Sequence, residues 1–380
     1  MLLNLSELRG CIKLDNKYVK LIFAAAAVFI IFLTINFYRK YNRNVIDEII
    51  SMDDMINVLV AGRNVYNENT FSFYALITIN PVNNNIGITF IPPDYRIMMN
   101  DDGTKIKKIS EIDLYYFDRI KYTLKKDIQM NVPFYIKVYS PDVVRAVNLI
   151  EGIDIFSMDQ SGFADKNSFG LNYLDGERTV SYINSSEKNS IYMKYDRILD
   201  LLLTLYNDKE NRKKLFNIEF ISEMFKNIKT NLLNQELYSI AEIVFKKGNV
   251  DSTLLPGGFN NGYYVVDELS YRTYQQEFLT NLVVETESEP TAKIKILNGT
   301  SIPGLARKLR NDLIRDGMNV VEFGTSNYPP IYDSIIICRK SDIKSVNKIA
   351  EMTGIGKIHF VTDTTQLNNI MIIVGEDMAK

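Results

Sequence analysis

The side chains that this sequence offers for chemistry are carboxylates, arginines and lysines. Its 380 residues include one histidine, His359, and two cysteines, Cys11 and Cys338. A zinc site usually takes about four nitrogen or sulfur ligands, and a Ser–His or Cys–His system needs a histidine beside the nucleophile. His359 lies in the apolar run KIHFV, which is typical of a strand and not of a ligand position. Chemistry in this chain must therefore rest on acids, guanidinium and ammonium groups, with a divalent ion as the cofactor they could hold.

The composition excludes further classes of function. A hydrophobic content of 46% supplies real cores, and 380 residues lead us to expect two folded units. The net charge of −2 gives no basis for wholesale nucleic-acid binding. Cys11 and Cys338 lie on opposite sides of a long apolar stretch, so we expect no disulfide framework.

That apolar stretch runs from Leu21 to Tyr38 and carries no charge. At about 1.5 Å per residue it falls just short of a ~30 Å hydrocarbon core, and basic flanks can supply the difference. These flanks are Lys17, Lys20, Arg39 and Lys40. The pattern predicts an uncleaved single-pass transmembrane helix over 21–38. A buried helix of a soluble core and a cleaved signal peptide are the alternatives.

The residues around this helix set its expected orientation. Lysines and arginines are slightly more numerous before it than after it, which favours a short cytoplasmic tail over 1–20. Residues 39–55 read as a helical stalk, with Ile46, Ile49 and Ile50 on one side. The bulk of the chain is then expected outside the cell membrane, with long domains crossing largely regardless of charge.

After the stalk, the pattern alternates between strands and helices. Ile56–Ala61 is a short apolar run of the buried-strand type, and residues 73–81 and 85–94 flank an Asn-rich link as a hairpin would. A helix is expected around 110–125, a strand at 134–140, and a helix after Pro141. The fold class predicted for 56–284 is an α/β sandwich with a mixed sheet.

The acidic segment 285–291 ends this region as a linker, and a small domain follows over 292–380. Its elements predict the order βαββαβ, which matches the ferredoxin-like split motif. The run Ile296–Val321 reads ILNGTSIPGLARKLRNDLIRDGMNVV. In it, Asn298-Gly299 predicts a turn that requires a positive φ, and Pro303-Gly304 leads into a helix. This stretch resembles the C-terminal domain of LytR-type proteins.

The upstream segment carries a second set of ordered features: a first strand ending at Gly62, a second ending in Ile79-Asn80-Pro81, and a third running into Pro92-Pro93-Asp94. The set continues with VPFYIKV, LIEGIDI, LDGERTVSYI and LLPGGFNNGYYVVDE. These features resemble the LytR-CpsA-Psr domain, and members of that family are phosphotransferases of the cell envelope. The resemblance implies transfer of a glycopolymer from a polyprenyl diphosphate carrier to the cell wall, with Mg²⁺ as cofactor and the membrane and the lipid-linked polymer as partners.

The chain departs from the family pattern at several charged positions. Asn64 stands where an Asp is expected after the first strand, Pro93 replaces an Arg, and Asn184 falls where a helix Arg is expected. The resemblance then leaves a reduced set of candidates. Asp94, Arg96 and Arg197 are the predicted catalytic residues; Lys108, Asp196 and Asn64 are predicted to bind substrate; Asp94 is the predicted metal ligand.

Three functions follow as hypotheses. The first is an envelope phosphotransferase with an altered site. The second is a non-catalytic relative that binds a lipid-linked envelope polymer or a partner protein, which the lost charges favour, because a charged hydrogen bond contributes about 1.5–3 kcal/mol. The third, a membrane-bound transcriptional regulator, is disfavoured because twenty residues before the anchor leave no room for a helix-turn-helix.

Overall fold

The computed structural model of the chain describes residues 44–63, 73–157, 170–184, 191–284, 292–339, 342–361 and 368–379. The predicted tail 1–20, the predicted transmembrane helix 21–38, Asn64 and the predicted linker 285–291 lie outside these residues. Within the described ranges, no helix combines the length and apolar character that crossing a membrane requires.

The first described element is α2 (Val45–Ser51), in the predicted stalk. Ile46 is fully buried in the main core, and Ile49 and Ile50 pack against that core. The Asp47 carboxylate accepts a hydrogen bond from Ser239 Oγ at 2.8 Å. The apolar side of this segment, recognised in the sequence, is therefore used to pack α2 onto the domain that follows.

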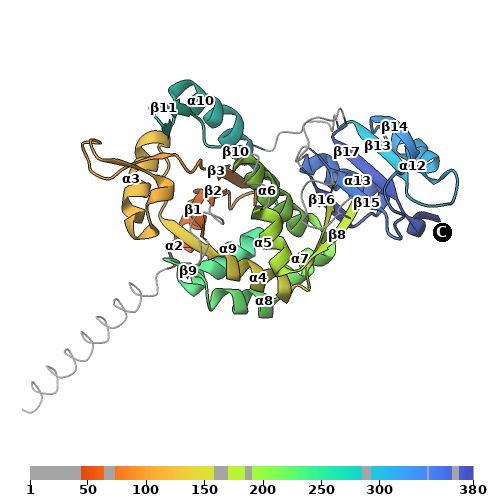
Figure 1. Cartoon of the computed structure of the whole chain (residues 1–380), viewed down its shortest axis with the longest axis horizontal. Coiled ribbons are helices and arrows are strands. Elements are labelled where there is room, and N and C mark those ends of the chain that lie inside the picture. Colours follow the sequence, from red (N-terminus) through yellow and green to blue (C-terminus); the bar gives the residue numbers. More distant parts are fainter. Residues whose placement is uncertain are drawn as a thin grey trace, which may run out of the picture. The chain divides into compact units, whose positions relative to one another are not determined.

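A six-stranded mixed sheet forms the centre of that domain (Figure 1), in the order β10-β3-β2-β1-β6-β9. The predicted mixed sheet is thus confirmed, as is the hairpin of β2 and β3. β1, β3, β6 and β10 run parallel, while β2 and β9 run against them. The strands are β1 (Ile56–Arg63), β2 (Phe73–Ile79), β3 (Ile86–Phe90), β6 (Phe134–Tyr139), β9 (Lys229–Thr230) and β10 (Val250–Leu254).

Both faces of this sheet are buried. Successive side chains of a strand point to opposite faces, so neighbouring residues report on the two sides. Val58 and Ala75 belong to one apolar cluster, whereas their neighbours Leu59 and Leu76 belong to another. Such double burial explains why these strands read as continuous apolar runs and do not alternate.

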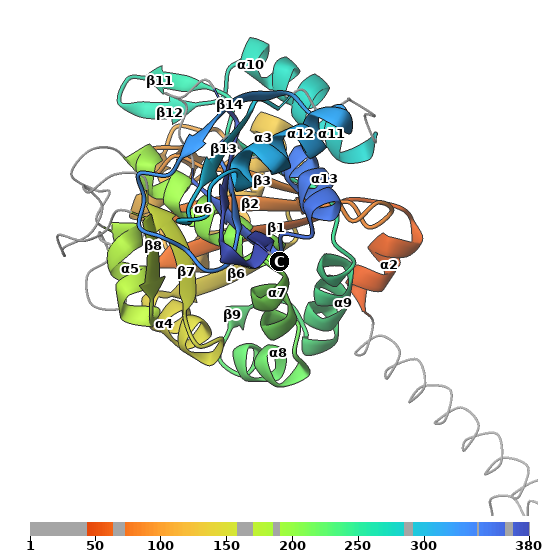
Figure 2. The same ribbon diagram turned by 90° about the vertical axis from the view of Figure 1, so that its right-hand side faces the viewer.

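Helices cover the two faces. Over the first face lie α4 (Ser140–Leu149), α5 (Gly176–Asn184), α6 (Ile191–Asn207), α7 (Lys209–Leu215), α8 (Ile218–Phe225) and α9 (Asn234–Phe245); Figure 2 shows α7, α8 and α9 gathered beside β9. Over the second lie α3 (Phe117–Ile128), α10 (Glu268–Thr273) and α11 (Thr280–Val283), the last two joined by a π-helical segment, Tyr274–Leu279. The helix expected at 110–125 begins later, because two 3₁₀ turns, Ile109–Glu111 and Leu114–Tyr116, precede it.

Three two-stranded antiparallel hairpins lie outside the main sheet of this domain. They pair β4 (Arg96–Met98) with β5 (Ile106–Lys108), β7 (Ile153–Ser157) with β8 (Gly170–Leu174), and β11 (Gly258–Asn260) with β12 (Tyr263–Val265). A parallel bridge from Tyr95 to Tyr264 connects the first hairpin to the last.

The C-terminal domain contains a five-stranded sheet in the order β14-β13-β17-β15-β16. Its elements are β13 (Ile294–Asn298), α12 (Leu305–Arg315), β14 (Val320–Thr325), β15 (Ile335–Cys338), α13 (Ile343–Thr353), β16 (Lys357–Phe360) and β17 (Ile370–Val374), followed by a 3₁₀ turn, Glu376–Ala379. As expected, His359 is a strand residue; Cys338 is the last residue of β15 and is buried.

The prediction of a ferredoxin-like split motif is wrong. β13 pairs directly with β14 and β15 with β16, both in parallel, so no strand separates the members of either βαβ unit. Instead, β17 lies between the two units, pairing with β13 on one side and β15 on the other. All five residues of β17 are buried, which explains why this strand occupies the middle of the sheet.

The turn chemistry of the NGT motif also differs from the prediction. Gly299 does not have a positive φ; Gly304 does, at +90°, where it precedes α12. Gly299 is required for a different reason, since an added Cβ would lie 2.8 Å from Ile373 Cγ2 and 3.0 Å from Val374 O. Asn298 closes the turn, with its Oδ1 accepting from Thr300 N and its Nδ2 donating to Ile302 O.

Candidate functional site

One edge of the first sheet collects the carboxyl ends of its four parallel strands. Arg63 is the last residue of β1, Asp94 follows β3, and Lys137 and Tyr139 lie near the end of β6. In open α/β sheets this edge is the usual position of ligand sites. The charged residues there are therefore the first candidates for function.

Two residues chosen from the sequence, Asp94 and Lys108, meet at this edge. Lys108 Nζ donates to Asp94 Oδ1 at 2.6 Å, and each side chain is about one-third exposed. The hydrogen bond to Asp94 is the main reason why the pKa of Lys108 is raised. The two side chains therefore hold each other in place at this edge.

The segment after Lys108 brings further charges alongside. Arg63 Nη2 donates to Ile112 O at 2.6 Å, and the Arg63 guanidinium lies 5.3 Å from the centre of the Tyr74 ring. Lys137 Nζ donates to Asp113 Oδ2 at 2.9 Å. We refer to Arg63, Asp94, Lys108, Asp113 and Lys137 as the charged cluster.

Lys137 is the most enclosed of the cluster's ion-paired groups, with 14% of its side chain exposed. Burial opposes its charge, but the hydrogen bonds to Asp113 and Tyr139 outweigh this effect and raise the pKa of Lys137. Burial likewise opposes the charge of Asp113, yet its pKa is lowered, because Lys137 and the Tyr115 amide bind the carboxylate. The pair is therefore fully ionised at neutral pH.

An apolar cavity of about 390 Å³ lies between the first face of the sheet and the helices that cover it. Its walls come from β1, β2, β3 and β6 and from α4, α5, α6 and α8. The polar side chains among the described lining residues are Lys137, Asp142 and Thr179. The aliphatic and aromatic lining includes Val60, Phe73, Ile77, Phe90, Val143, Ala146, Ile198, Leu201, Leu205 and Met224.

The two charged lining residues, Lys137 and Asp142, come from the end of β6 and the start of α4. Lys137 pairs in register with Ala61, near the carboxyl end of β1, and Asp142 lies in the first turn of α4. The Asp142 carboxylate accepts from Tyr139 N at 2.9 Å, which fixes the start of α4. The cavity is thus almost wholly apolar, and the Lys137 ammonium pairs with Asp113 on the other face of the sheet, where Ala61 and Tyr74 pack.

Helix α6 lines this cavity and carries two further candidates, Asp196 and Arg197. Arg197 Nη1 donates to Tyr182 O at 2.6 Å, and its guanidinium lies 4.7 Å from the centre of the Tyr182 ring. Burial raises the pKa of Asp196. On the same helix, burial raises the pKa of Tyr195, and Tyr192, Tyr74 and Asp94 add smaller effects in the same direction.

Arg96 is held by a different acid. Arg96 Nη2 lies 3.6 Å from Asp127 Oδ1, and Tyr95 Oη donates to Asp127 Oδ2 at 3.0 Å. Arg96 pairs with Lys108 across the β4–β5 hairpin, so its backbone is beside the cluster while its guanidinium binds Asp127. The structure therefore brings Asp94 and Lys108 together and gives Arg96 and Arg197 protein partners. Asn64 lies outside the described residues.

Sequence reasoning missed Arg63 and Lys137 at the site, and it also missed Lys194, a buried lysine on the helix that lines the cavity. Lys194 is 2% exposed, on the side of α6 that carries Ile198 and Leu201. A lysine in register with an apolar helical stripe is a signal that could have been read from the sequence. Arg63 and Lys137 carry no such signal, because their significance comes from the parallel pairing of β1 with β6.

The predicted magnesium ligand, Asp94, does not form a metal site with its described neighbours. No group of three or more His, Cys, Asp or Glu residues lies together in the described ranges. Asp94 Oδ1 already accepts from Lys108, and Asp113, the other acid of the cluster, is bound by Lys137. Since this donor set does not fit an ion by itself, we derive no chemical step through Mg²⁺.

Comparison with known proteins gives one family match. Residues 291–377 match the family described as LytR cell envelope-related transcriptional attenuator. No curated protein matches the chain.

The solved structures that are similar to the chain include the following three. "TagT bound to LI-WTA" is 17% identical, with a TM-score of 0.49 over 61% of this chain and 92% of that one. TagV of B. subtilis is 18% identical, with a TM-score of 0.47 over 61% and 98%. "LytR-CPS2A-psr family protein YwtF (TagT) with bound octaprenyl pyrophosphate lipid" is 16% identical, with a TM-score of 0.45 over 61% and 91%.

The family match coincides with the domain built on β13 to β17, which contains the NGT turn and the glycine at the start of α12. The chain therefore carries a C-terminal domain of the LytR family over residues 291–377.

Proposed function

We propose that the chain is a LytR-CpsA-Psr-type envelope protein that binds a polyprenyl phosphate- or diphosphate-linked glycopolymer. The observation that carries the proposal is the 390 Å³ apolar cavity, whose lining includes residues near the carboxyl ends of β1, β3 and β6, the edge at which the charged cluster gathers. The ordered motifs between Gly62 and Asp267 and the LytR-family domain behind them support the same assignment.

The cavity suits a prenyl tail for energetic reasons. Removing a CH₂-sized group from water contributes about 0.8 kcal/mol, so one five-carbon isoprene unit contributes up to ~4 kcal/mol before its ordering is counted. Because the lining has few polar side chains, displacing water from the cavity breaks few hydrogen bonds to protein. A sugar or a peptide, by contrast, would leave its own polar groups unsatisfied there.

The charged cluster suits the phosphate of such a ligand. Arg63, Lys108 and Lys137 supply guanidinium and ammonium donors, and Lys137 belongs both to the cluster and to the cavity wall. Cations bind phosphate oxygens through charge-assisted hydrogen bonds, which are about twice as strong as neutral ones. A ligand with an apolar tail and an anionic head would therefore satisfy both parts of the site at once.

We favour binding over transfer as the function. Asp94 is held by Lys108 and Arg96 by Asp127, so both must exchange partners before they could act on a diphosphate. Pro93, Asn184 and Asn64 also lack the charges that the family resemblance calls for at their positions. We further propose that residues 21–38 anchor the chain in the cell membrane with the site on the outer side, within reach of a carrier that stays in the bilayer.

The second candidate is transfer itself. The acceptor hydroxyl would attack the phosphorus that bears the polymer, its bond to the bridging oxygen would break, and polyprenyl phosphate would leave. The partly exposed Asp94 carboxylate is the group that would receive the hydroxyl proton, and Lys108 would stabilise the charge that develops on the phosphate oxygens. Asp94 and Lys108 lie together at the sheet edge, which is the observation that favours this candidate.

The proposal is tested by blocking the cavity. In the Ala146→Phe variant of the full chain a ring occupies the space between α4 and the sheet, so we expect binding of farnesyl diphosphate, measured by calorimetry, to be lost. Leu149→Phe adds a ring to the same helix at a residue that is 45% exposed and does not line the cavity, and it should bind as the parent does.

Two further ligands separate the tail from the head. Farnesol should bind more weakly than farnesyl diphosphate, and inorganic pyrophosphate should bind weakly to both variants. Equal binding of farnesyl diphosphate to the Ala146→Phe and Leu149→Phe proteins would refute the assignment of the cavity.

A further inference from the structure

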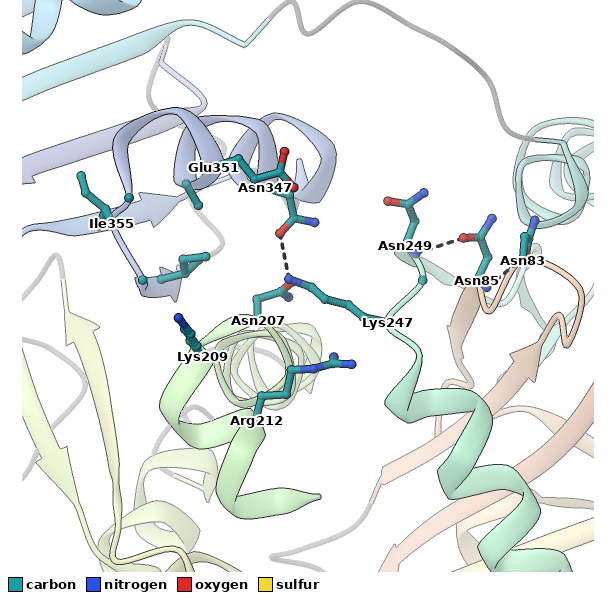
Figure 3. Close-up of a pocket in the computed structure, with 15 residues that line it drawn as sticks. Asn83, Asn85, Asn207, Lys209, Arg212, Lys247, Asn249, Asn347, Glu351 and Ile355 are labelled. Atoms are coloured by element: carbon teal, nitrogen blue, oxygen red, sulfur yellow. Dashed lines mark hydrogen bonds between the residues drawn. The ribbon is translucent and has the colours of Figure 1, made fainter. Parts of the chain in front are cut away.

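A second pocket lies away from the sheet edge and shares no residue with the apolar cavity. Its volume is about 650 Å³, within the range of pockets that hold small ligands. The described residues from Ile46 onward belong to one compact unit, and the pocket lies inside it. Figure 3 shows side chains that enter from α7, from the segment after α9 and from α13.

The charge of this pocket is positive. Lys209, Arg212 and Lys247 line it, together with one acid, Glu351. Within the described ranges, none of these three cations forms an ion pair. Desolvation by the surrounding protein lowers the pKa of Lys247, and the charge of the nearby Arg212 lowers it further; Glu351 acts more weakly in the opposite direction. The Lys247 side chain is nevertheless exposed to solvent. Two cations that repel each other in this way would be stabilised by an anion.

Arg212 is held rigidly. Its guanidinium lies over the rings of Tyr206, Phe216 and Phe245, at 4.9, 5.2 and 5.8 Å from their centres, and Nη2 donates to Phe245 O. A site whose cation is already fixed loses little side-chain entropy when a ligand binds. These aromatic faces are used by the arginine, so a flat base has no free ring on which to stack.

The remaining polar lining consists of amides. Lys247 Nζ donates to Asn347 Oδ1 at 3.1 Å, the contact drawn in Figure 3. Asn207 is 3% exposed; its Nδ2 donates to Leu203 O, while its buried Oδ1 lacks a hydrogen-bond partner among the described residues. A buried acceptor that lines a pocket and has no donor is costly unless a ligand or water supplies one. Hydroxyl groups supply such donors.

The lining therefore combines fixed positive charge with amides that recognise hydroxyl groups. We propose that this pocket binds a phosphate-bearing saccharide, with the phosphate on Lys209, Arg212 and Lys247 and the sugar hydroxyls on Asn207 and Asn347. The proposal rests on this pocket alone and does not depend on a lipid in the apolar cavity.

The test uses the full chain and N-acetylglucosamine 1-phosphate as the probe, with binding measured by calorimetry. The double variant Lys209→Gln/Lys247→Gln removes two pocket charges and should weaken binding at least about tenfold. The matched control Lys213→Gln/Lys246→Gln removes two exposed lysines from α7 and the end of α9 that do not line the pocket, and it should bind as the parent does. Unfolding temperatures of both proteins confirm that they remain folded.

Three more probes identify the ligand class. N-acetylglucosamine and inorganic phosphate should each bind more weakly than the combined probe, and inorganic phosphate binding as tightly would overturn the proposal in favour of a simple anion site. An oligomer of glycerol phosphate that binds more tightly than the monomer points to a polymer as the source, and equal binding points to a free sugar phosphate. Equal loss in the pocket and control variants, or no binding of any probe, would refute the assignment.

Discussion

His359 makes the stability of this protein depend on pH in a way that can be isolated, because it is the only histidine in the sequence. It lies in β16, opposite Ile337 of β15, and is 3% exposed. Neither ring nitrogen makes a hydrogen bond of good geometry with the described residues, and the nearby Asp154 backbone stabilises the protonated ring only weakly. Burial lowers the pKa of His359 from 6.5 to about 4, with the charge of Lys357 acting in the same direction and the Asp154 backbone opposing it.

The sign of the effect follows from proton binding. Between pH 6.5 and 4, the unfolded chain binds a proton at this position that the folded chain excludes, so the folded state loses stability as the pH falls. Above pH 6.5 the imidazole is neutral in both the folded and the unfolded chain, so the folded state keeps its full stability there. A difference of about 2.5 pKa units at ~1.36 kcal/mol per unit gives a loss of about 3 kcal/mol by pH 4.

The assay compares the wild-type protein with the His359→Phe variant, which keeps a planar ring and cannot titrate. Unfolding by urea is followed by circular dichroism between pH 7.5 and 4, since the chain has no tryptophan to report by fluorescence. Burial raises the pKa of Asp127, Asp196 and Asp208, which acts in the opposite direction, but these groups are common to both proteins and cancel in the difference.

We expect the stability difference between the two proteins to change by about 3 kcal/mol across this range, in favour of the variant at low pH. His359→Gln serves as a second non-titrating variant in case the phenyl ring packs poorly. A difference that stays constant with pH, or an NMR titration that places the imidazole midpoint near 6.5, would refute the reasoning.

The remaining predictions concern the charged cluster and the sheet. Asp94→Ala should abolish any transfer of polymer from a polyprenyl diphosphate donor while changing stability by no more than about 1 kcal/mol, because its ion pair with Lys108 is partly exposed; transfer that survives would exclude Asp94 from the chemistry. Gly62→Ala should lower the free energy of unfolding by about 1–3 kcal/mol, because the new Cβ would lie 2.2 Å from the Phe73 ring. Gly324→Ala, where a Cβ meets nothing within 4 Å, is the control; an equal effect at the two glycines, measured by urea unfolding, would contradict the steric explanation.

The local elements of the fold were readable from the sequence because their signals are local. The β2–β3 hairpin is marked by two apolar runs around an Asn-rich turn, and the start of α4 by Pro141. The order of strands in the second sheet was not readable from the sequence. The five apolar residues of β17 indicate a buried, central strand, but they do not specify its neighbours. Gly299 and Gly304 show the same limit: both are recognisable as required glycines, but only the packed structure shows which one has the positive φ and which one meets Ile373.

The sequence by itself determined the class of this protein: its alternating elements, the NGT motif of the C-terminal domain, and a chemistry restricted to acids and basic side chains. It also placed Asp94 and Lys108 among the candidates, through motifs that are contiguous in the chain. Only the tertiary structure decided which charges meet. Lys137 reaches the cluster because β6 pairs with β1, and Lys247 reaches Asn347 from a residue one hundred positions away. Such contacts are set by strand pairing and by packing between distant helices, which local patterns of residues do not specify.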